Sequence, residues 1–282
     1  MTSEVVAGQA VTRDPHPRPR PAILRLLAVP QAAFGMAVIA LVVICAVFAP
    51  WLMPFDPQEM DFDNLLAGAT AAHPFGSDQM GRDTLSRLML GSQVALQVSI
   101  GAVGIGMAVG IPLGLVGVYL RGWVDDAIMR VMDALVVFPS LLVAVGLAAA
   151  MGNSLSTVIL AIGIANVPWM ARIIRAQALA LRELDFIAAA VAGGFGQTRI
   201  MLRHILPNSI APVIVQATLG MGYAVLTEAA LGFIGVGVQP PTPTWGNMLQ
   251  QAFPLLDRQP LLSVAPGVAI FLLVLAFNLV GD

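Results

Sequence analysis

Few side chains in this sequence are of the types that carry out chemistry, and they do not form a catalytic cluster. All 14 basic residues are arginine, which excludes the phosphate-binding lysine of a P-loop and a Schiff-base or general-base lysine. The three histidines, His16, His73 and His204, lie in separate regions, and no serine or cysteine has a base nearby in the sequence. The single cysteine, Cys45, lies in an apolar run. We therefore predict a non-catalytic chain with no metal site and no cofactor of its own.

Two positions hold polar groups whose surroundings point to a function. Glu228 lies late in a long apolar stretch, where a lone carboxylate is costly, so a role in a translocation path, together with Thr227, is one interpretation. A carboxylate at the outer membrane interface, hydrogen-bonded to backbone or to Thr227, is the other. His73 lies among acids, but one histidine with scattered carboxylates is weak support for a metal site. The alternative there is a turn network in which Ser77 or Asp78 caps the next helix.

The composition shows what kind of elements must hold these residues. Of the 282 residues, 58% are hydrophobic and 11% are charged, against roughly 25% charged in an ordinary soluble domain. The mean hydropathy is +0.85. So few polar residues cannot cover a soluble core, and the chain must be embedded largely in lipid. The predicted fold class is an all-α membrane protein.

Uncharged stretches long enough to cross a bilayer recur along the chain, since a spanning helix needs about 20 apolar residues. A cleaved signal peptide is the alternative for the first stretch, which is longer than the roughly 7–15 residues of a signal core. The stretch from Ala134 to Ala171 is too long for one crossing, and turn-forming residues from Gly152 to Ser156 divide it. Arg130 and Asp133, one helical turn apart, can pair or snorkel at the edge of its first half. The sequence predicts six transmembrane helices, near residues 31–53, 93–118, 127–150, 156–173, 209–233 and 261–280.

The placement of the arginines predicts the orientation, because cytoplasmic loops beside membrane spans carry an excess of basic residues. We predict a multi-pass membrane chain with both termini in the cytoplasm. A disordered arm over residues 1–30 is followed by a transmembrane domain over 31–282, with an acidic outer loop over 54–90 and a cytoplasmic region over 172–208. The arginines predicted inside are Arg13, Arg18, Arg20, Arg25, Arg121, Arg130, Arg172, Arg175, Arg182, Arg199 and Arg203, against Arg82, Arg87 and Arg258 outside.

Small residues mark two surfaces for close contact. Gly106, Gly110 and Gly114 recur every four residues in the second predicted span, which predicts close packing against a neighbouring helix, with a pore-lining face as the alternative. The cytoplasmic region 172–208 is longer than a simple link between two spans needs. Its alanines and glycines would present a nearly bare backbone on which another protein could dock. Gly194 can take the left-handed conformation that ends a helix.

The same segment carries a recognisable motif. AAAVAGGFGQTRIMLRHILP resembles the EAA motif of ATP-binding-cassette (ABC) importer permeases, which is EAA, three residues, Gly, nine residues and I-x-L-P. Gly194, Leu206 and Pro207 match the motif at its spacing. Ala188 replaces its glutamate, and His204 replaces its isoleucine. The resemblance implies a coupling helix that fits a groove on an ATPase. The residues it places in this role, with their flanking arginines, are Ala188, Ala189, Ala190, Gly193, Gly194, Arg199, Arg203, Leu206 and Pro207.

Three further segments resemble the C-type inner-membrane subunit of dipeptide and oligopeptide importers. They are HPFGSDQMGRDTLSR (His73–Arg87), RGWVD (Arg121–Asp125) and EAALGFIGVGVQPPTPTWGNML (Glu228–Leu249). The implied fold is the six-helix bundle of a type I ABC importer permease. The implied function is a permease that forms half of a path for dipeptides or oligopeptides. A nickel or glutathione importer and a self-sufficient ion-coupled transporter are the alternatives.

The resemblance also implies partners. They are a homologous second permease, two ATPases that bind ATP and Mg, an extracytoplasmic substrate-binding protein, membrane lipid and a peptide substrate, with no nucleic acid. In relatives, the outer segment lies where the binding protein docks. The residues placed in that contact are Asp78, Arg82 and Asp83.

Overall fold

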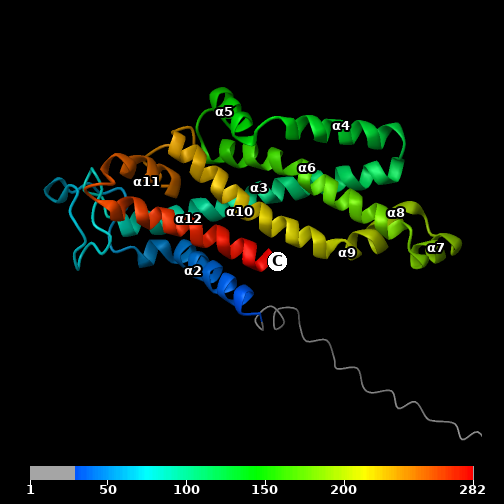
Figure 1. Cartoon of the computed structure of the whole chain (residues 1–282), viewed down its shortest axis with the longest axis horizontal. Coiled ribbons are helices and arrows are strands. Elements are labelled where there is room, and N and C mark those ends of the chain that lie inside the picture. The colour runs from blue at the N-terminus through cyan, green and yellow to red at the C-terminus, as the bar shows by residue number, and fades with distance from the viewer. Residues whose placement is uncertain (1–28, 282) are drawn as a thin grey trace, which may run out of the picture.

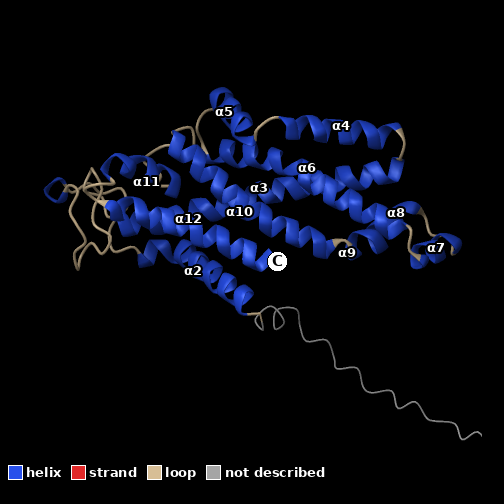
Figure 2. Cartoon of the chain, in the orientation of Figure 1, coloured by secondary structure: helices blue, strands red, loops and turns tan. Residues whose placement is uncertain are grey.

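The computed structural model describes residues 29–281, which form helices and loops without a β-sheet (Figure 2). Within that range Ser77 and Asp83 form an isolated β-bridge. The predicted arm over residues 1–30 lies outside the described residues, apart from its last two. The helices are α2 (Pro30–Leu52), α3 (Thr84–Leu120), α4 (Trp123–Val137), α5 (Ser140–Met151), α6 (Leu155–Arg182), α7 (Asp185–Ala192), α8 (Gln197–Ile200), α9 (Leu206–Asn208), α10 (Ile210–Ile234), α11 (Trp245–Ala252) and α12 (Pro260–Gly281). Short 3-10 turns lie at Phe62–Asn64 and Phe253–Leu255, and a π-helical turn at Met201–Ile205.

The long helices confirm the predicted fold class. Among the described residues α2, α3, α6, α10 and α12 are each long and apolar enough to cross a membrane, and α4 with α5 forms a sixth candidate that is bent by 86°. The span predicted near residues 127–150 is therefore divided into two helices. The break falls at Phe138–Pro139, because proline lacks an N–H and pushes the preceding residue towards extended backbone. Phe138 has a ψ of 124°.

Two helices are longer than a bilayer requires. With 37 residues in α3 and 28 in α6, their lengths are about 55 and 42 Å, against a hydrocarbon core of about 30 Å. Figure 1 shows α7 and α8 at one end of the bundle, and α11 with the loop over residues 53–83 at the other. Both helices continue through charged residues beyond the predicted spans. The loop between α2 and α3 therefore ends at Asp83, and the connection between α6 and α10 begins at Glu183.

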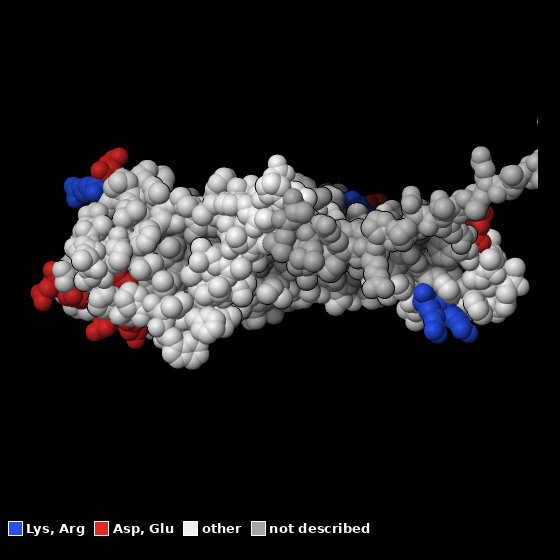
Figure 3. All heavy atoms as spheres, turned by 90° about the horizontal axis from the view of Figure 1, so that it is seen from below, with Lys and Arg blue, Asp and Glu red and all other residues white. Residues whose placement is uncertain are grey.

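Charge is distributed along the long axis of the bundle. On the face seen in Figure 3, acidic side chains gather at the end that holds the outer loop, and basic side chains lie near the opposite end. A broad uncharged surface separates the two. This band is the part of the molecule suited to the hydrocarbon core, because an exposed charge there is costly.

The glycine face of α3 packs against α6. A Cβ at Gly106 would lie 2.8 Å from the Asn166 Cβ, and one at Gly110 would lie 2.6 Å from the Val167 carbonyl oxygen. Gly114 approaches the Ala171 backbone equally closely. The predicted packing role of these glycines is thereby confirmed, and the pore-lining alternative is wrong. The contact sets the spacing between the two helices that reach furthest towards α7 (Figure 1).

We expect Gly110→Val to destabilise the bundle by about 1–3 kcal/mol, the usual cost of overpacking. The added side chain would meet backbone of α6, which cannot rotate away. Thermal unfolding of the purified protein in detergent measures the loss. Gly104→Val is the matched control on the same helix, because no atom lies within 4 Å of a Cβ there. An equal loss in both variants would contradict the packing role.

The charged residues of α4 pair differently from expectation. Asp133 accepts a hydrogen bond from the Arg172 guanidinium of α6 at 2.6 Å, with the two side chains 65% and 36% exposed. The predicted Arg130–Asp133 pair is wrong, since no ion pair of Arg130 is found among the described residues. The packing of α4 on α6 brings Arg172 to Asp133.

Candidate functional site

The connection between α6 and α10, residues 183–208, is called the coupling segment from here on. It begins with α7 and turns back at Gly194 into α8. Gly194 has a φ of +76°, which confirms the predicted left-handed conformation. Its N–H donates to the Val191 carbonyl at 3.0 Å, and the Phe195 N–H donates to the Ala190 carbonyl at 3.1 Å. These bonds satisfy carbonyls that the end of α7 leaves free.

The alanines of α7 do not share one face. Ile187 and Ala190, 4% and 8% exposed, pack into an apolar cluster with Ile200 and Ile205. Ala188 and Ala189 are exposed. The helical period places residues three apart on one face, so the motif divides into an inward-facing residue and two outward-facing ones. Of the other predicted coupling residues, those that are exposed are Gly193, Gly194, Arg199, Arg203 and Pro207, and Leu206 is half-buried.

Phe195 lies among the exposed residues of the coupling segment, which we call the coupling surface, and the sequence did not predict it. Its ring stacks on the His204 ring, with centroids 6.2 Å apart and planes 12° apart. The Arg199 guanidinium carbon lies 4.4 Å from the Phe195 ring centroid, which is a cation–π contact. Phe195 remains 40% exposed. Its position as an aromatic residue in a run of small residues could have identified it. His204, which replaces the isoleucine of the motif, stacks against its ring.

An ion pair holds the helices from which the coupling segment projects. Arg175 of α6 donates to both carboxylate oxygens of Asp125 of α4, at 2.7 and 2.6 Å. Asp125 also lies against α3, since a Cβ at Gly117 would be 2.7 Å from its Oδ1. Arg182 donates to the Val118 carbonyl at 3.0 Å. These contacts tie together α3, α4 and α6 near the point where the coupling segment begins.

We expect Asp125→Ala to cost about 1–2 kcal/mol of stability, because the bidentate pair is charge-assisted and only partly exposed. The Arg175 side chain is 31% exposed and that of Asp125 is 14% exposed. Asp126→Ala, the neighbouring exposed acid, should change stability by no more than about 0.5 kcal/mol. Thermal unfolding of Asp125→Ala, of Arg175→Ala and of the variant that carries both substitutions measures the coupling energy between the two side chains. Simple additivity of the two single losses would contradict the pair.

The outer loop is organised by two carboxylates, the half-buried Asp78 and the buried Asp83. Asp78 accepts a hydrogen bond from the Arg82 Nε at 2.8 Å, and its Oδ2 lies 3.5 Å from the Arg87 Nε. Asp83 caps α3 and accepts from the Ser86 N–H at 2.7 Å. His73 lies 3.0 Å from the same Asp83 carboxylate. A turn network around His73 is therefore present, but the helix cap is Asp83 and not Ser77 or Asp78.

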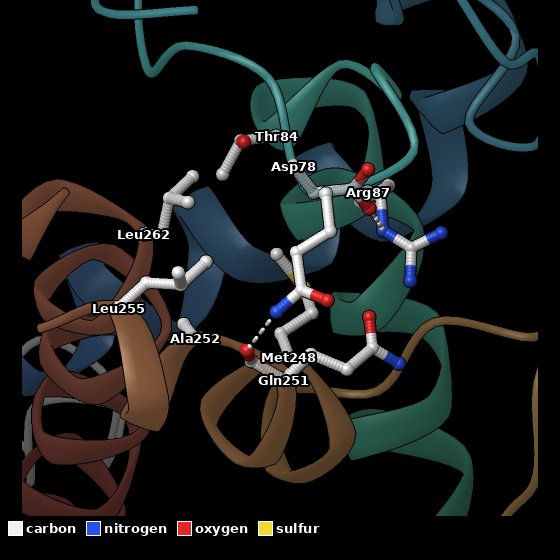
Figure 4. A pocket seen from close by; sticks show the side chains of 9 residues that line it. Asp78, Thr84, Arg87, Met248, Gln251, Ala252, Leu255 and Leu262 are labelled. Atoms are coloured by element: carbon white, nitrogen blue, oxygen red, sulfur yellow. Dashed lines mark hydrogen bonds and ion pairs between the residues drawn. The ribbon is translucent and has the colours of Figure 1, made fainter. Parts of the chain in front are cut away.

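These contacts leave little of the predicted docking residues at the surface. Arg82 is 5% exposed and Asp83 is 2% exposed, and the Asp78 side chain is 15% exposed. Figure 4 shows Asp78 and Arg87 beside the α11 residues Met248 and Gln251. Arg82 also donates to the Gln251 Oε1 at 3.2 Å, which joins the loop to α11. Arg82 and Asp83 therefore offer almost no exposed side-chain surface to a docking protein.

The exposed acids of the outer loop lie elsewhere. Asp56, Glu59, Asp61 and Asp63 line a hollow of about 440 Å³. The Asn64 side-chain amide donates to Asp61 at 2.8 Å. That bond, followed by the Asp63 N–H, lowers the pKa of the Asp61 carboxyl below its usual value. The Asp61 carboxyl is therefore held in its ionised form at neutral pH. Within residues 29–281, no three His, Cys, Asp or Glu side chains converge in a group that could hold a metal ion.

Glu228 is sealed between α10 and the start of α11. It is 2% exposed, and its Oε1 has no hydrogen-bond partner among the described residues. Thr244, the cap residue of α11, lies beside this carboxyl. The two helices meet closely here, since a Cβ at Gly246 would lie 2.5 Å from the Ala229 carbonyl oxygen. Thr227 instead donates to the Tyr223 carbonyl of its own helix at 2.8 Å.

Comparison with protein families gives two matches. Residues 103–282 match the model described as binding-protein-dependent transport system inner membrane component. Residues 20–69 match the N-terminal TM domain of oligopeptide transport permease C. Together the two matches extend over most of the chain and include the coupling segment.

Curated relatives and solved structures agree with these matches. A dipeptide transport system permease protein, DppC of Alkalihalophilus pseudofirmus, is 43% identical over 251 residues, which cover 89% of this chain and 83% of the relative. A glutathione transport system permease protein, GsiD of Escherichia coli O6:K15:H31, is 42% identical over 245 residues, covering 86% and 81%. A chain of the inward-facing MetNI methionine ABC transporter aligns with a TM-score of 0.59 at 18% identity, covering 70% of this chain and 93% of that one. This last likeness shows the fold alone.

Proposed function

This chain belongs to the family of binding-protein-dependent transport system inner membrane components, and we propose that it is a permease subunit of an ABC importer for dipeptides or oligopeptides. In this assignment the chain forms half of the translocation path. The observation that carries the proposal is the 43% identity to a dipeptide permease over 89% of the chain. The apolar helices described above supply the lipid-embedded body that such a subunit needs.

ATP hydrolysis belongs to partner chains in this proposal. The chain has no lysine and hence no P-loop, and its relatives carry the names of permease subunits. Two ATPases would bind ATP and Mg and contact the exposed part of the coupling segment, around Ala188, Ala189 and Gly194. A packed contact is needed there, because a conformational change passes between subunits only through an interface with discrete arrangements.

Two further partners belong to this proposal, a second permease and a binding protein. A homologous second permease would complete the path, and an extracytoplasmic binding protein would dock on the outer loop. The exposed acids Asp56, Glu59 and Asp63 are better placed for that contact than the buried Arg82 and Asp83. The acidic loop and the arginine-bearing coupling segment lie at opposite ends. By the positive-inside rule, the coupling segment and both termini would then face the cytoplasm.

Glutathione is the second candidate cargo. The relative GsiD, named for glutathione transport, is 42% identical over 86% of the chain, which is nearly the same similarity as that to the dipeptide permease. Glutathione is itself a short peptide, so one permease body would suit both cargoes.

Reconstitution tests this proposal. The native complex is purified through this chain and placed in proteoliposomes with its binding protein, and uptake of labelled dialanine and labelled glutathione is measured with and without ATP. We expect a second permease and two ATPases to co-purify and uptake of one of these peptides to require ATP. Uptake by this chain alone, or purification without any ATPase, would overturn the assignment.

A further inference from the structure

A polar groove lies on the side of the bundle, between α6 and α10. It has a volume of about 320 Å³ and is lined by Asn166 and Trp169 of α6 and by Gln216, Leu219, Gly220 and Tyr223 of α10. Trp169 and Tyr223 are each 48% exposed. The Tyr223 hydroxyl hydrogen-bonds to the Ser140 hydroxyl of α5 at 2.7 Å. Three helices therefore contribute hydrogen-bonding groups to one face.

The groove lies deep in the membrane-spanning part. Asn166 follows the start of α6 at Leu155 by eleven residues, and Tyr223 precedes the end of α10 at Ile234 by the same number. At 1.5 Å per residue, both lie about 17 Å from the outer ends of their helices, which is near the middle of a hydrocarbon core of about 30 Å. Lipid chains at that depth offer no hydrogen bonds.

A face of this composition is unsuited to lipid. The Asn166 Nδ2 donates to the Ile162 carbonyl of its own helix at 2.9 Å, and its Oδ1 is directed towards Gly220, 3.2 Å from where a Cβ would stand there. Gln216 and Tyr223 also line the groove, and the Tyr223 hydroxyl is already bonded to Ser140. An uncompensated carboxamide in hydrocarbon is costly, so water or a hydrogen-bonding molecule must cover the half-buried Gln216.

The chemistry of the lining specifies the ligand. No acidic or basic side chain lines the groove. The Arg172 guanidinium lies 5.9 Å from the Trp169 ring centroid, but it is paired with the Asp133 carboxylate, so the groove holds no unpaired charge for an ion. Carboxamides donate and accept hydrogen bonds at once, as a peptide group does, and the Trp169 and Tyr223 rings offer apolar surface to a side chain. Building on the proposed function, we propose that this groove is a half-site that binds the neutral peptide backbone of the cargo at the middle of the path.

An uncharged lining allows short peptides of different length to use the same path. A site that pairs with the ionised termini would require fixed spacing between them, whereas every short peptide carries peptide groups. The open side of the groove leaves the rest of the cargo to a facing surface of the second permease. Glu228 is sealed off at the start of α11, so it contributes no charge to the groove.

Cysteine accessibility in the intact complex tests the location. In a Cys45→Ser background, Gln216→Cys is compared with Ile214→Cys, an apolar position on the same helix that is 55% exposed and does not line the groove. We expect a charged methanethiosulfonate reagent to modify the Gln216→Cys variant about tenfold faster, because a wet thiol ionises and a lipid-facing thiol does not. Saturating dialanine, presented by the binding protein, should slow that modification. Equal rates at both positions, or no protection by dialanine, would overturn the proposal.

Uptake by the same complex tests the ligand chemistry. Gln216→Leu should raise the half-saturating dialanine concentration about fivefold through the loss of one hydrogen bond. Thr218→Val is the control, since the Thr218 hydroxyl donates only within α10. An unchanged half-saturating concentration, or loss of the second permease from the purified complex, would refute the half-site. Absence of dialanine and glutathione uptake by the wild-type complex would instead refute the proposed function.

Discussion

Replacing Gly194 by arginine is expected to abolish transport while leaving the chain folded and inserted. No atom lies within 4 Å of a Cβ at Gly194, so the new side chain would project outwards and disturb no packing of this chain. The left-handed backbone at a φ of +76° adds strain of roughly 1–2 kcal/mol. A bulky cation in the centre of a packed interface costs about 2 kcal/mol or more, which predicts at least a tenfold loss of substrate-stimulated ATP hydrolysis and of import.

Gly122→Arg is the matched control for that experiment. Gly122 has a φ of +56° and also has no atom within 4 Å of a Cβ, but it lies in the turn between α3 and α4. The two variants therefore share a positive φ at the substituted residue and the added charge, and differ in whether they touch the coupling segment. We expect Gly122→Arg to keep most of its import activity. Equal loss in both variants, or substrate-stimulated hydrolysis that survives Gly194→Arg, would contradict the coupling role.

Replacing Glu228 by lysine is expected to unfold or severely destabilise the protein. The site is 2% exposed, and the contacts of Ala229 and Gly232 with Gly246 and Asn247 close it. An ammonium group there would have no carboxylate partner, and an uncompensated buried charge costs about 3–5 kcal/mol. Thermal unfolding in detergent and the yield of folded protein measure the loss.

Glu228→Gln separates a structural role from a role in the path. The amide keeps the size and can still accept a hydrogen bond, so we expect stability within about 1 kcal/mol of wild type and unchanged peptide uptake. Lost uptake with normal stability would place Glu228 in the path. Wild-type stability of Glu228→Lys would show that water reaches the site.

The crossings and the coupling segment were predictable because their signals are local. A bilayer acts on each stretch of chain separately, so the length and hydropathy of a stretch predict a crossing, as for α2 and α12. The four-residue spacing from Gly106 to Gly114 identifies a contact face whatever its partner is. The left-handed turn at Gly194 likewise follows from one residue type at the end of a helix.

The partners of polar groups were not predictable in the same way. Asp133 was expected to pair with Arg130 on its own helix and instead contacts Arg172 on α6. Asp125 finds Arg175 fifty positions away. Which side chains meet depends on the rotation and depth of each helix, and neighbouring helices set both.

Taken by itself, the amino-acid order determined that this is a lipid-embedded helical bundle with a small-residue segment facing one side. The tertiary structure decided that Arg82 and Asp83 are internal, that Phe195 belongs to the coupling surface, and that α6 and α10 share a polar groove. The physical reason is that each stretch of chain partitions between water and lipid according to its own hydropathy. A site forms only when helices from separate stretches pack together, each at a particular depth in the membrane and a particular rotation about its axis.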